Sequence, residues 1–215
     1  MKTAQWIDLL ARSADPAPQR LVLRRLAPVA ALRAPGSTAI AVAWLGWVRA
    51  EMFLTSAPRL KLAYAAAMAA SAGWLTARLA RPVARLAAPL RAVMGVVVGV
   101  ALAVGLLGAL AWATTPAPLR QAAQMGHSWQ ACPLIAPSLP APVMAGLLWA
   151  LRGLAPTRPR AAGAAAGLLA GALGAAGYAR ACTEDSTAFI AAWYSAGIAI
   201  TGGLSAALGP RVLRW

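Results

Sequence analysis

The feature that most constrains this chain is a series of long stretches without a charged side chain. Residues 92–113 (AVMGVVVGVALAVGLLGALAWA) and 188–208 contain no Asp, Glu, Lys, Arg or His, and residues 161–178 share this property while being rich in Ala and Gly. A helix of about 20 apolar residues crosses the roughly 30 Å hydrocarbon layer of a bilayer. These stretches therefore predict membrane-spanning helices. A content of 60% hydrophobic and 12% charged residues excludes an ordinary water-soluble domain.

Two further segments are weaker candidates for spans. Residues 62–77 are apolar but short, and the flanking Lys61 and Arg78 have side chains long enough to snorkel outward to the interface. Residues 131–151 are apolar but contain four prolines. We expect an irregular outer half and a helical remainder there, since proline removes a main-chain donor.

The first span is the least regular. Its uncharged core covers only residues 34–48, because three residues interrupt the apolar run: Arg33, Pro35 and Gly36. With this span, the sequence predicts an all-α polytopic membrane protein, a six-helix transmembrane bundle. We expect two regions, an N-terminal segment over residues 1–33 and the six-span domain over residues 34–215.

The positive charges are distributed unequally between the two sides of this bundle. Fifteen of the 20 Lys and Arg residues fall on one side, in residues 2–33, 78–91, 152–160 and 211–214, and five on the other. Basic residues are retained in the cytoplasm. The sequence therefore predicts that both termini are cytoplasmic (N-in/C-in). The net charge of +15 is then a topology signal, and we expect no direct contact with nucleic acid.

Glycines recur at helical spacing in two of the predicted spans. Gly163, Gly167 and Gly171 are four residues apart, and Gly95 and Gly99 repeat the interval. Such spacing lets helix backbones approach closely within a membrane. Packing inside the bundle and a dimer interface both explain it.

Catalytic and transport chemistry find little support in the residues. His127 is the only histidine and has no carboxylate or nucleophile at an interpretable spacing, so we expect no enzyme and no resident cofactor. Spans two to six lack deep charged groups, which ion and proton pathways need. A permease for a small solute or metal and a structural membrane scaffold remain as alternatives.

Both cysteines fall on the non-cytoplasmic side of the predicted topology. Cys132 and Cys182 lie at the outer ends of neighbouring spans, with His127, Glu184 and Asp185 nearby in sequence. Two thiols, an imidazole and two carboxylates suit transient binding of a soft metal, or oxidant sensing by the thiols. A permanent disulfide, or two inert buried thiols, would explain the cysteines equally simply.

The N-terminal segment carries its own apolar stripe. Residues 3–12 place Trp6, Leu9 and Leu10 on one helical face, and a second, basic helix is expected from Gln19 to Arg33. A piece this small must bury its stripe against another surface. That surface is either the inner leaflet of the membrane or a groove on a protein partner.

The ordered set of local segments resembles the NrsF family of membrane anti-sigma factors. The matching segments are IDLLARSADPAP at residues 7–18, HSWQACPL at 127–134, LLWALRGLAPTRPR at 147–160, CTEDSTAFIAAWYSAGI at 182–198 and LGPRVLRW at 208–215. The interrupted first span departs from the family's pattern.

This resemblance implies a function. It implies an inner-membrane protein that holds an extracytoplasmic-function (ECF) sigma factor inactive at its cytoplasmic N-terminal segment. The sigma-binding residues would be Trp6, Ile7, Leu9 and Leu10. The family's paired outer cysteines, which sense heavy-metal or oxidative stress, correspond to Cys132 and Cys182.

Overall fold

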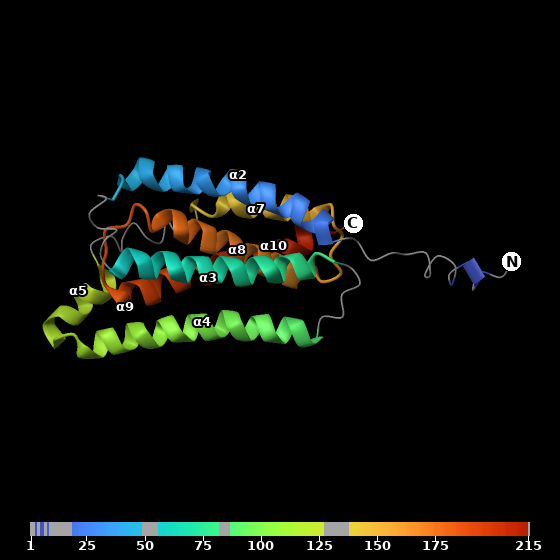
Figure 1. Ribbon diagram of the computed structural model, residues 1–215. Helices are drawn as coiled ribbons and strands as arrows, with labels where there is room; N and C mark the ends of the chain where they lie inside the picture. The colour runs from blue at the N-terminus through green and yellow to red at the C-terminus, as the bar shows by residue number, and fades with distance from the viewer. Residues whose placement is uncertain are drawn as a thin grey trace.

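The computed structural model describes residues 3, 5, 6, 8, 19–48, 56–81, 87–126 and 138–214, and its regular structure in this part of the chain is entirely helical (Figure 1). The elements are α2 (Gln19–Leu45), α3 (Ser56–Leu79), α4 (Ala87–Thr114), η2 (Ala117–Leu119), α5 (Arg120–Met125), α7 (Ala141–Arg152), α8 (Pro159–Tyr178), α9 (Thr187–Phe189), η3 (Ile190–Tyr194) and α10 (Ser195–Val212). The predicted all-α class is confirmed for these residues.

Successive long helices run in opposite directions along the bundle axis, which gives the bundle two distinct ends (Figure 1). We call one the arginine-rich end; it holds the helix termini Gln19, Leu79, Ala87, Arg152, Pro159 and Val212. The other is the cysteine end; it holds Leu45, Ser56, Thr114, Tyr178 and Thr187.

Helix α8 occupies the centre of the bundle and contacts α2, α3, α7 and α10. Twelve of its 20 residues are buried, and nearly all of these are Ala or Gly. Small side chains let several helices pack closely around one central helix. The Ala- and Gly-rich composition that weakens α8 as a hydropathy signal is therefore what makes it the central helix.

Four helical segments are long and apolar enough to cross a membrane: Val22–Leu45, Met94–Thr114, Pro159–Tyr178 and Thr187–Val212. Helix α3 has 24 residues, so it has the length to cross, but it lacks the hydropathy of those four. Helix α7 is apolar but has only 12 residues, about 18 Å at 1.5 Å per residue. The helical remainder expected within residues 131–151 is confirmed, and residues 131–137 lie outside the described part of the chain.

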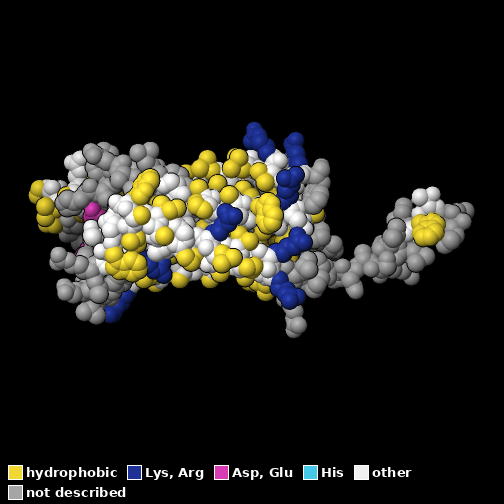
Figure 2. Space-filling model, turned by 90° about the horizontal axis from the view of Figure 1, so that it is seen from above, with side chains coloured by type: hydrophobic (Ala, Val, Ile, Leu, Met, Phe, Trp, Pro, Cys, Tyr) yellow, Lys and Arg dark blue, Asp and Glu magenta, His cyan; other side chains and the backbone are white. Residues whose placement is uncertain are grey.

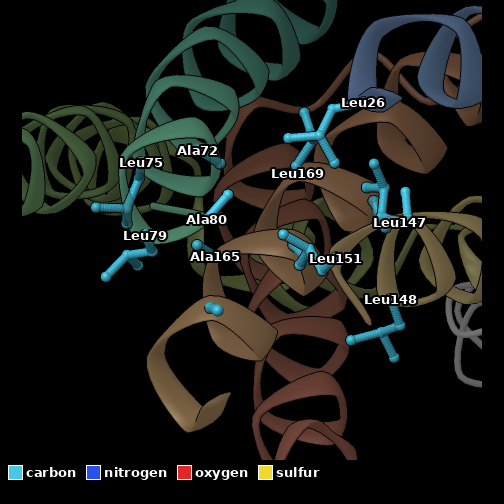
Figure 3. Packing of buried hydrophobic residues seen from close by; sticks show 14 of the residues in the cluster. Leu26, Ala72, Leu75, Leu79, Ala80, Leu147, Leu148, Leu151, Ala165 and Leu169 are labelled. Atoms are coloured by element: carbon cyan, nitrogen blue, oxygen red, sulfur yellow. The ribbon is translucent and has the colours of Figure 1, made fainter. Parts of the chain in front are cut away.

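Leucines from four helices meet around α8 near the arginine-rich end and form the larger buried cluster (Figure 3). Leu26 comes from α2, Leu75 from α3, Leu147 from α7 and Leu169 from α8. A second cluster fills the cysteine end and includes Tyr64, Met68, Leu139, Phe189 and Cys182. The bundle thus has an apolar core at both ends.

The expectation that the basic helix ends at Arg33, before the first span, is wrong. The basic helix begins at Gln19 as expected, but it continues without interruption through Pro35 to Leu45. Arg33 therefore lies about 21 Å along α2, near the middle of the Val22–Leu45 segment.

Contacts with α7 and the turn before it explain why α2 stays helical. Arg33 Nη1 donates to the Pro142 carbonyl (3.1 Å), and Ser37 Oγ donates to the Leu139 carbonyl (2.7 Å). These bonds satisfy main-chain oxygens at the irregular start of α7, which no water would reach inside a bilayer. Of the three residues that interrupt the apolar run, Arg33 instead attaches α2 to its neighbour.

The predicted close packing is confirmed for the glycine row of α8, whereas for the pair on α4 the dimer interface stays a prediction. A Cβ on Gly163 or Gly167 would lie 2.5 Å from the Ser205 or Thr201 carbonyl oxygen of α10, respectively, so this glycine row mediates packing within the chain. Gly95 and Gly99 on α4 have no neighbouring atom within 4 Å of such a Cβ. Helix α4 lies at the edge of the bundle, and among the described residues these glycines bring no neighbouring element into close contact.

Candidate functional site

Cys182 lies in the short connection between α8 and α9 at the cysteine end. Its amide donates to the Tyr178 carbonyl (2.9 Å), which continues the last turn of α8. The residue is only 5% exposed, and its thiol forms no disulfide within the described residues. Its accessibility to a reagent therefore depends on how firmly this connection is held.

Lys61 of α3 holds that connection in place. Its side chain is fully buried, and Nζ donates to the carbonyl oxygens of Cys182 (3.1 Å) and Glu184. The expectation that Lys61 snorkels outward is wrong, because two main-chain acceptors on the protein take the place of water. The sequence indicated this role of Lys61 only by placing a lysine beside an apolar run. The acceptors of Lys61 lie more than 120 residues away in sequence, so no local pattern pointed to them.

The predicted metal cluster is only partly described. Glu184 contacts the end of α5 closely, since a Cβ on Gly126 would lie 2.7 Å from its carboxyl carbon. Asp185 is exposed on the same connection. His127 and Cys132 lie outside the described residues, and within the described part of the chain no three His, Cys, Asp or Glu residues gather as a metal site would require.

The polar residues of the last span make hydrogen bonds to other helices and within α10. The Ser195 hydroxyl bonds to that of Tyr64 on α3 (2.8 Å), and Trp193 Nε1 donates to the Gln124 carbonyl of α5 (3.0 Å). Thr201 Oγ1 donates to Gly197 of its own helix (2.8 Å). Ser186 Oγ accepts from the Phe189 amide (3.4 Å) and caps α9. The segment Ile190–Tyr194 is a turn of π-helix, a feature frequent at functional sites.

The opposite end of the bundle concentrates guanidinium groups. Figure 2 shows Lys and Arg side chains gathered there, and Arg25 Nη1 donates to the Gly153 carbonyl at the end of α7 (3.0 Å). Arg78 stacks over the ring of Trp74 at 4.6 Å from its centroid. The further described arginines at this end are Arg24, Arg81, Arg91, Arg152, Arg158, Arg160, Arg211 and Arg214.

Before Gln19, the N-terminal segment is described at four positions only. Thr3, Gln5, Trp6 and Asp8 have helical backbone, and Trp6 is 54% exposed. The other predicted docking residues, Ile7, Leu9 and Leu10, lie outside the described residues. An exposed Trp6 is the observation that bears on docking.

Comparisons with known proteins place the chain in a family. The NrsF family, described as "Negative regulator of sigma F", matches residues 10–215. The anti-sigma-F factor NrsF of Caulobacter vibrioides is 36% identical over 226 aligned residues that cover all of both chains. A probable anti-sigma-F factor NrsF of Azospira oryzae is 47% identical over 90 residues, 42% of each chain. No solved structure matches. The resemblance seen in the sequence is thereby confirmed, and the chain belongs to the NrsF family.

Proposed function

We propose that this chain is a transmembrane anti-sigma factor that sequesters an ECF sigma factor at the bacterial inner membrane and releases it under heavy-metal or oxidative stress. The observation that carries the proposal is the similarity to the anti-sigma-F factor of Caulobacter vibrioides, which extends over both chains from end to end. A similarity confined to the membrane helices would not indicate which protein this chain binds. Here the N-terminal segment is included.

The membrane arrangement that we propose has six spans, with both termini in the cytoplasm. The four long apolar segments, together with α3 and the region of α7, would supply the six crossings. The concentration of arginines at one end supports a cytoplasmic position for that end. The chain then presents its N-terminal segment to cytosolic proteins.

The docking element that we propose is the segment of residues 1–33, with its anchors at Trp6, Ile7, Leu9 and Leu10. Large apolar side chains in a small interface contribute most of the binding energy. The exposure of Trp6 supports this role, because an anchor must be available to a partner. Val22 and Leu26 of α2 are buried in the bundle core, so the anchors that we propose all precede α2 in the sequence.

The sensor that we propose is the pair Cys132 and Cys182, which transiently binds a soft metal or is oxidised. Lys61 supplies a route from the sensor, because its ammonium attaches the Cys182 connection directly to α3. Helix α3 then runs to the arginine-rich end, and Tyr64 joins it to Ser195 near the π-helical turn. A rearrangement at Cys182 would thus move an element that reaches the cytoplasmic side.

Capture of the sigma factor tests the docking proposal. The full chain in detergent should retain a co-expressed ECF sigma factor, and the variant Trp6→Ala/Leu9→Ala/Leu10→Ala should lose it by more than tenfold, since apolar anchors contribute ~2 kcal/mol or more each. A composition-matched control is Trp47→Ala/Leu102→Ala/Leu106→Ala, whose residues are 62–67% exposed on the bundle. Equal retention by both variants would overturn the assignment.

Induction of sigma-dependent genes tests the sensor separately. Cys132→Ser/Cys182→Ser should keep binding the sigma factor and should no longer respond to cadmium, chromate or peroxide, because a serine hydroxyl neither binds soft metals well nor forms a disulfide. The two single variants show whether both thiols are required. Normal induction in the double variant would sink the sensing proposal and leave the docking proposal intact.

A further inference from the structure

A groove at the arginine-rich end combines two guanidinium groups with an apolar wall. It lies between α2 and the last turn of α7, and its lining is Arg25, Val29, Trp149, Ala150, Arg152 and Gly153. Arg25 contributes its side chain from α2, and Arg152 is the last residue of α7. Two positive charges from different helices thus converge on one hollow.

Arg25 is held in a fixed position with donors to spare. Its Nη1 bonds to the Gly153 carbonyl, which also places a positive charge at the negative end of the α7 dipole. A guanidinium has five N–H donors in a rigid fork, and this bond uses one of them. The remaining fork suits the oxygens of a phosphate.

The residues that line this groove include no carboxylate. The five acidic residues of the chain are Asp8, Asp15, Glu51, Glu184 and Asp185, so residues 52–183, which supply Arg152, contain none. Glu184 and Asp185 belong to the cysteine end. The groove lining therefore supplies no counter-charge of its own to Arg25 and Arg152, and an external anion would supply one.

The rest of the groove suits a lipid rather than a free ion. Trp149 is 73% exposed, and tryptophan side chains favour the headgroup level of a bilayer. Val29 and Ala150 give an apolar surface beside the guanidinium groups. A ligand with a phosphate joined to glycerol and acyl chains would contact both parts.

A second groove at the same end is less suitable for binding a phospholipid. It is lined by Leu23, Gly73, Trp74, Ala77, Arg78 and Arg81. There the Arg78 guanidinium already stacks on Trp74. In the groove of Arg25 and Arg152, by contrast, the Trp149 side chain is 73% exposed and so is available to a ligand.

We propose that the groove formed by Arg25, Trp149 and Arg152 binds the phosphate of one anionic glycerophospholipid, whose glycerol and acyl chains lie along Val29 and Ala150. Zwitterionic lipids bind more weakly, because the groove offers no carboxylate to a choline or ethanolamine group. The site is independent of the sigma factor and requires only the folded bundle.

Native mass spectrometry of the full chain in detergent tests this site. Titration with phosphatidylglycerol should give one retained lipid at low concentration, and phosphatidylcholine with the same acyl chains should not. Arg25→Gln/Arg152→Gln should weaken retention by about fivefold for each charge removed. Arg158→Gln/Arg160→Gln removes the same charge at the same end, outside the groove lining, and should leave retention unchanged.

Two further measurements keep the test decisive. Trp149→Ala changes an exposed side chain without altering charge, and it should also weaken phosphatidylglycerol retention. Inorganic phosphate at millimolar concentration should not displace the lipid. The proposal is overturned if both arginine pairs weaken binding equally, if Trp149→Ala has no effect, or if inorganic phosphate competes fully.

Discussion

Lys61 shows how one side chain can attach a loop to a distant helix. Its ammonium is buried and bonded to two main-chain oxygens of the connection that carries Cys182. A hydrogen bond to a charged group contributes ~1.5–3 kcal/mol, more than a neutral bond. The position of the thiol is therefore determined by a side chain on another helix as well as by its own backbone.

Replacement of Lys61 should expose the thiol. In a Cys132→Ser background, Lys61→Met should increase the rate at which a maleimide labels Cys182 and lower stability by ~1.5–3 kcal/mol, because two acceptors lose their donor. Arg59→Met is a matched control on α3, since Arg59 is exposed. If the two variants label at the same rate, Lys61 does not control access to Cys182.

At the scale of elements, the packing of α8 against α10 depends on the absence of side chains. Gly163, Gly167 and Gly171 each face the main chain of α10. Because a close helix pair in a membrane is stabilised by van der Waals contact, even one methyl group must separate the two backbones.

A single methyl group measures that contact. Gly167→Ala would place a Cβ 2.5 Å from the Thr201 carbonyl oxygen, so we expect a loss of ~1–3 kcal/mol of stability. Gly203→Ala is the matched control on α10, because a Cβ there meets nothing within 4 Å. Thermal unfolding in detergent should show a lower midpoint temperature for Gly167→Ala than for the unsubstituted chain, and an unchanged midpoint for Gly203→Ala. Equal midpoints for the two variants would contradict the close contact.

The elements that the sequence predicted well are those specified by local properties. Uncharged length predicted the helices now described as α4, α8 and α10, and glycine spacing predicted one helix contact. The continuity of α2 and the burial of Lys61 depend on partners 109 and 121 residues away, Pro142 and Cys182. No local pattern contains such partners, so both features were missed.

For the whole molecule, the decisive property is which end faces the cytoplasm. Both termini and most of the basic residues belong to the predicted cytoplasmic side, whereas Cys182 belongs to the opposite end. The apolar stripe in the sequence suggested the docking residues at the N-terminus, and this assignment stays a prediction. The structure adds the exposure of Trp6 alone, because the other anchors lie outside the described residues.

Impermeant thiol labelling of intact cells measures this orientation. In a Cys132→Ser/Cys182→Ser background, Ala117→Cys at the cysteine end should label from outside, and Thr157→Cys at the arginine-rich end should label only after the cells are permeabilised; both native residues are exposed. Arginine-rich segments are retained in the cytoplasm, which sets this expectation. The reverse pattern would contradict the proposed topology.

The bond between Arg33 and Pro142 also bears on the order of biogenesis. As a membrane span, α2 carries a guanidinium near its midpoint, which costs ~2.5–3.5 kcal/mol at the centre of a bilayer unless it is satisfied. Its acceptor is synthesised 109 residues later. In the proposed topology, α2 therefore gains this bond only after the chain has been synthesised through Pro142, so part of the stability of the first proposed span comes from a later part of the protein.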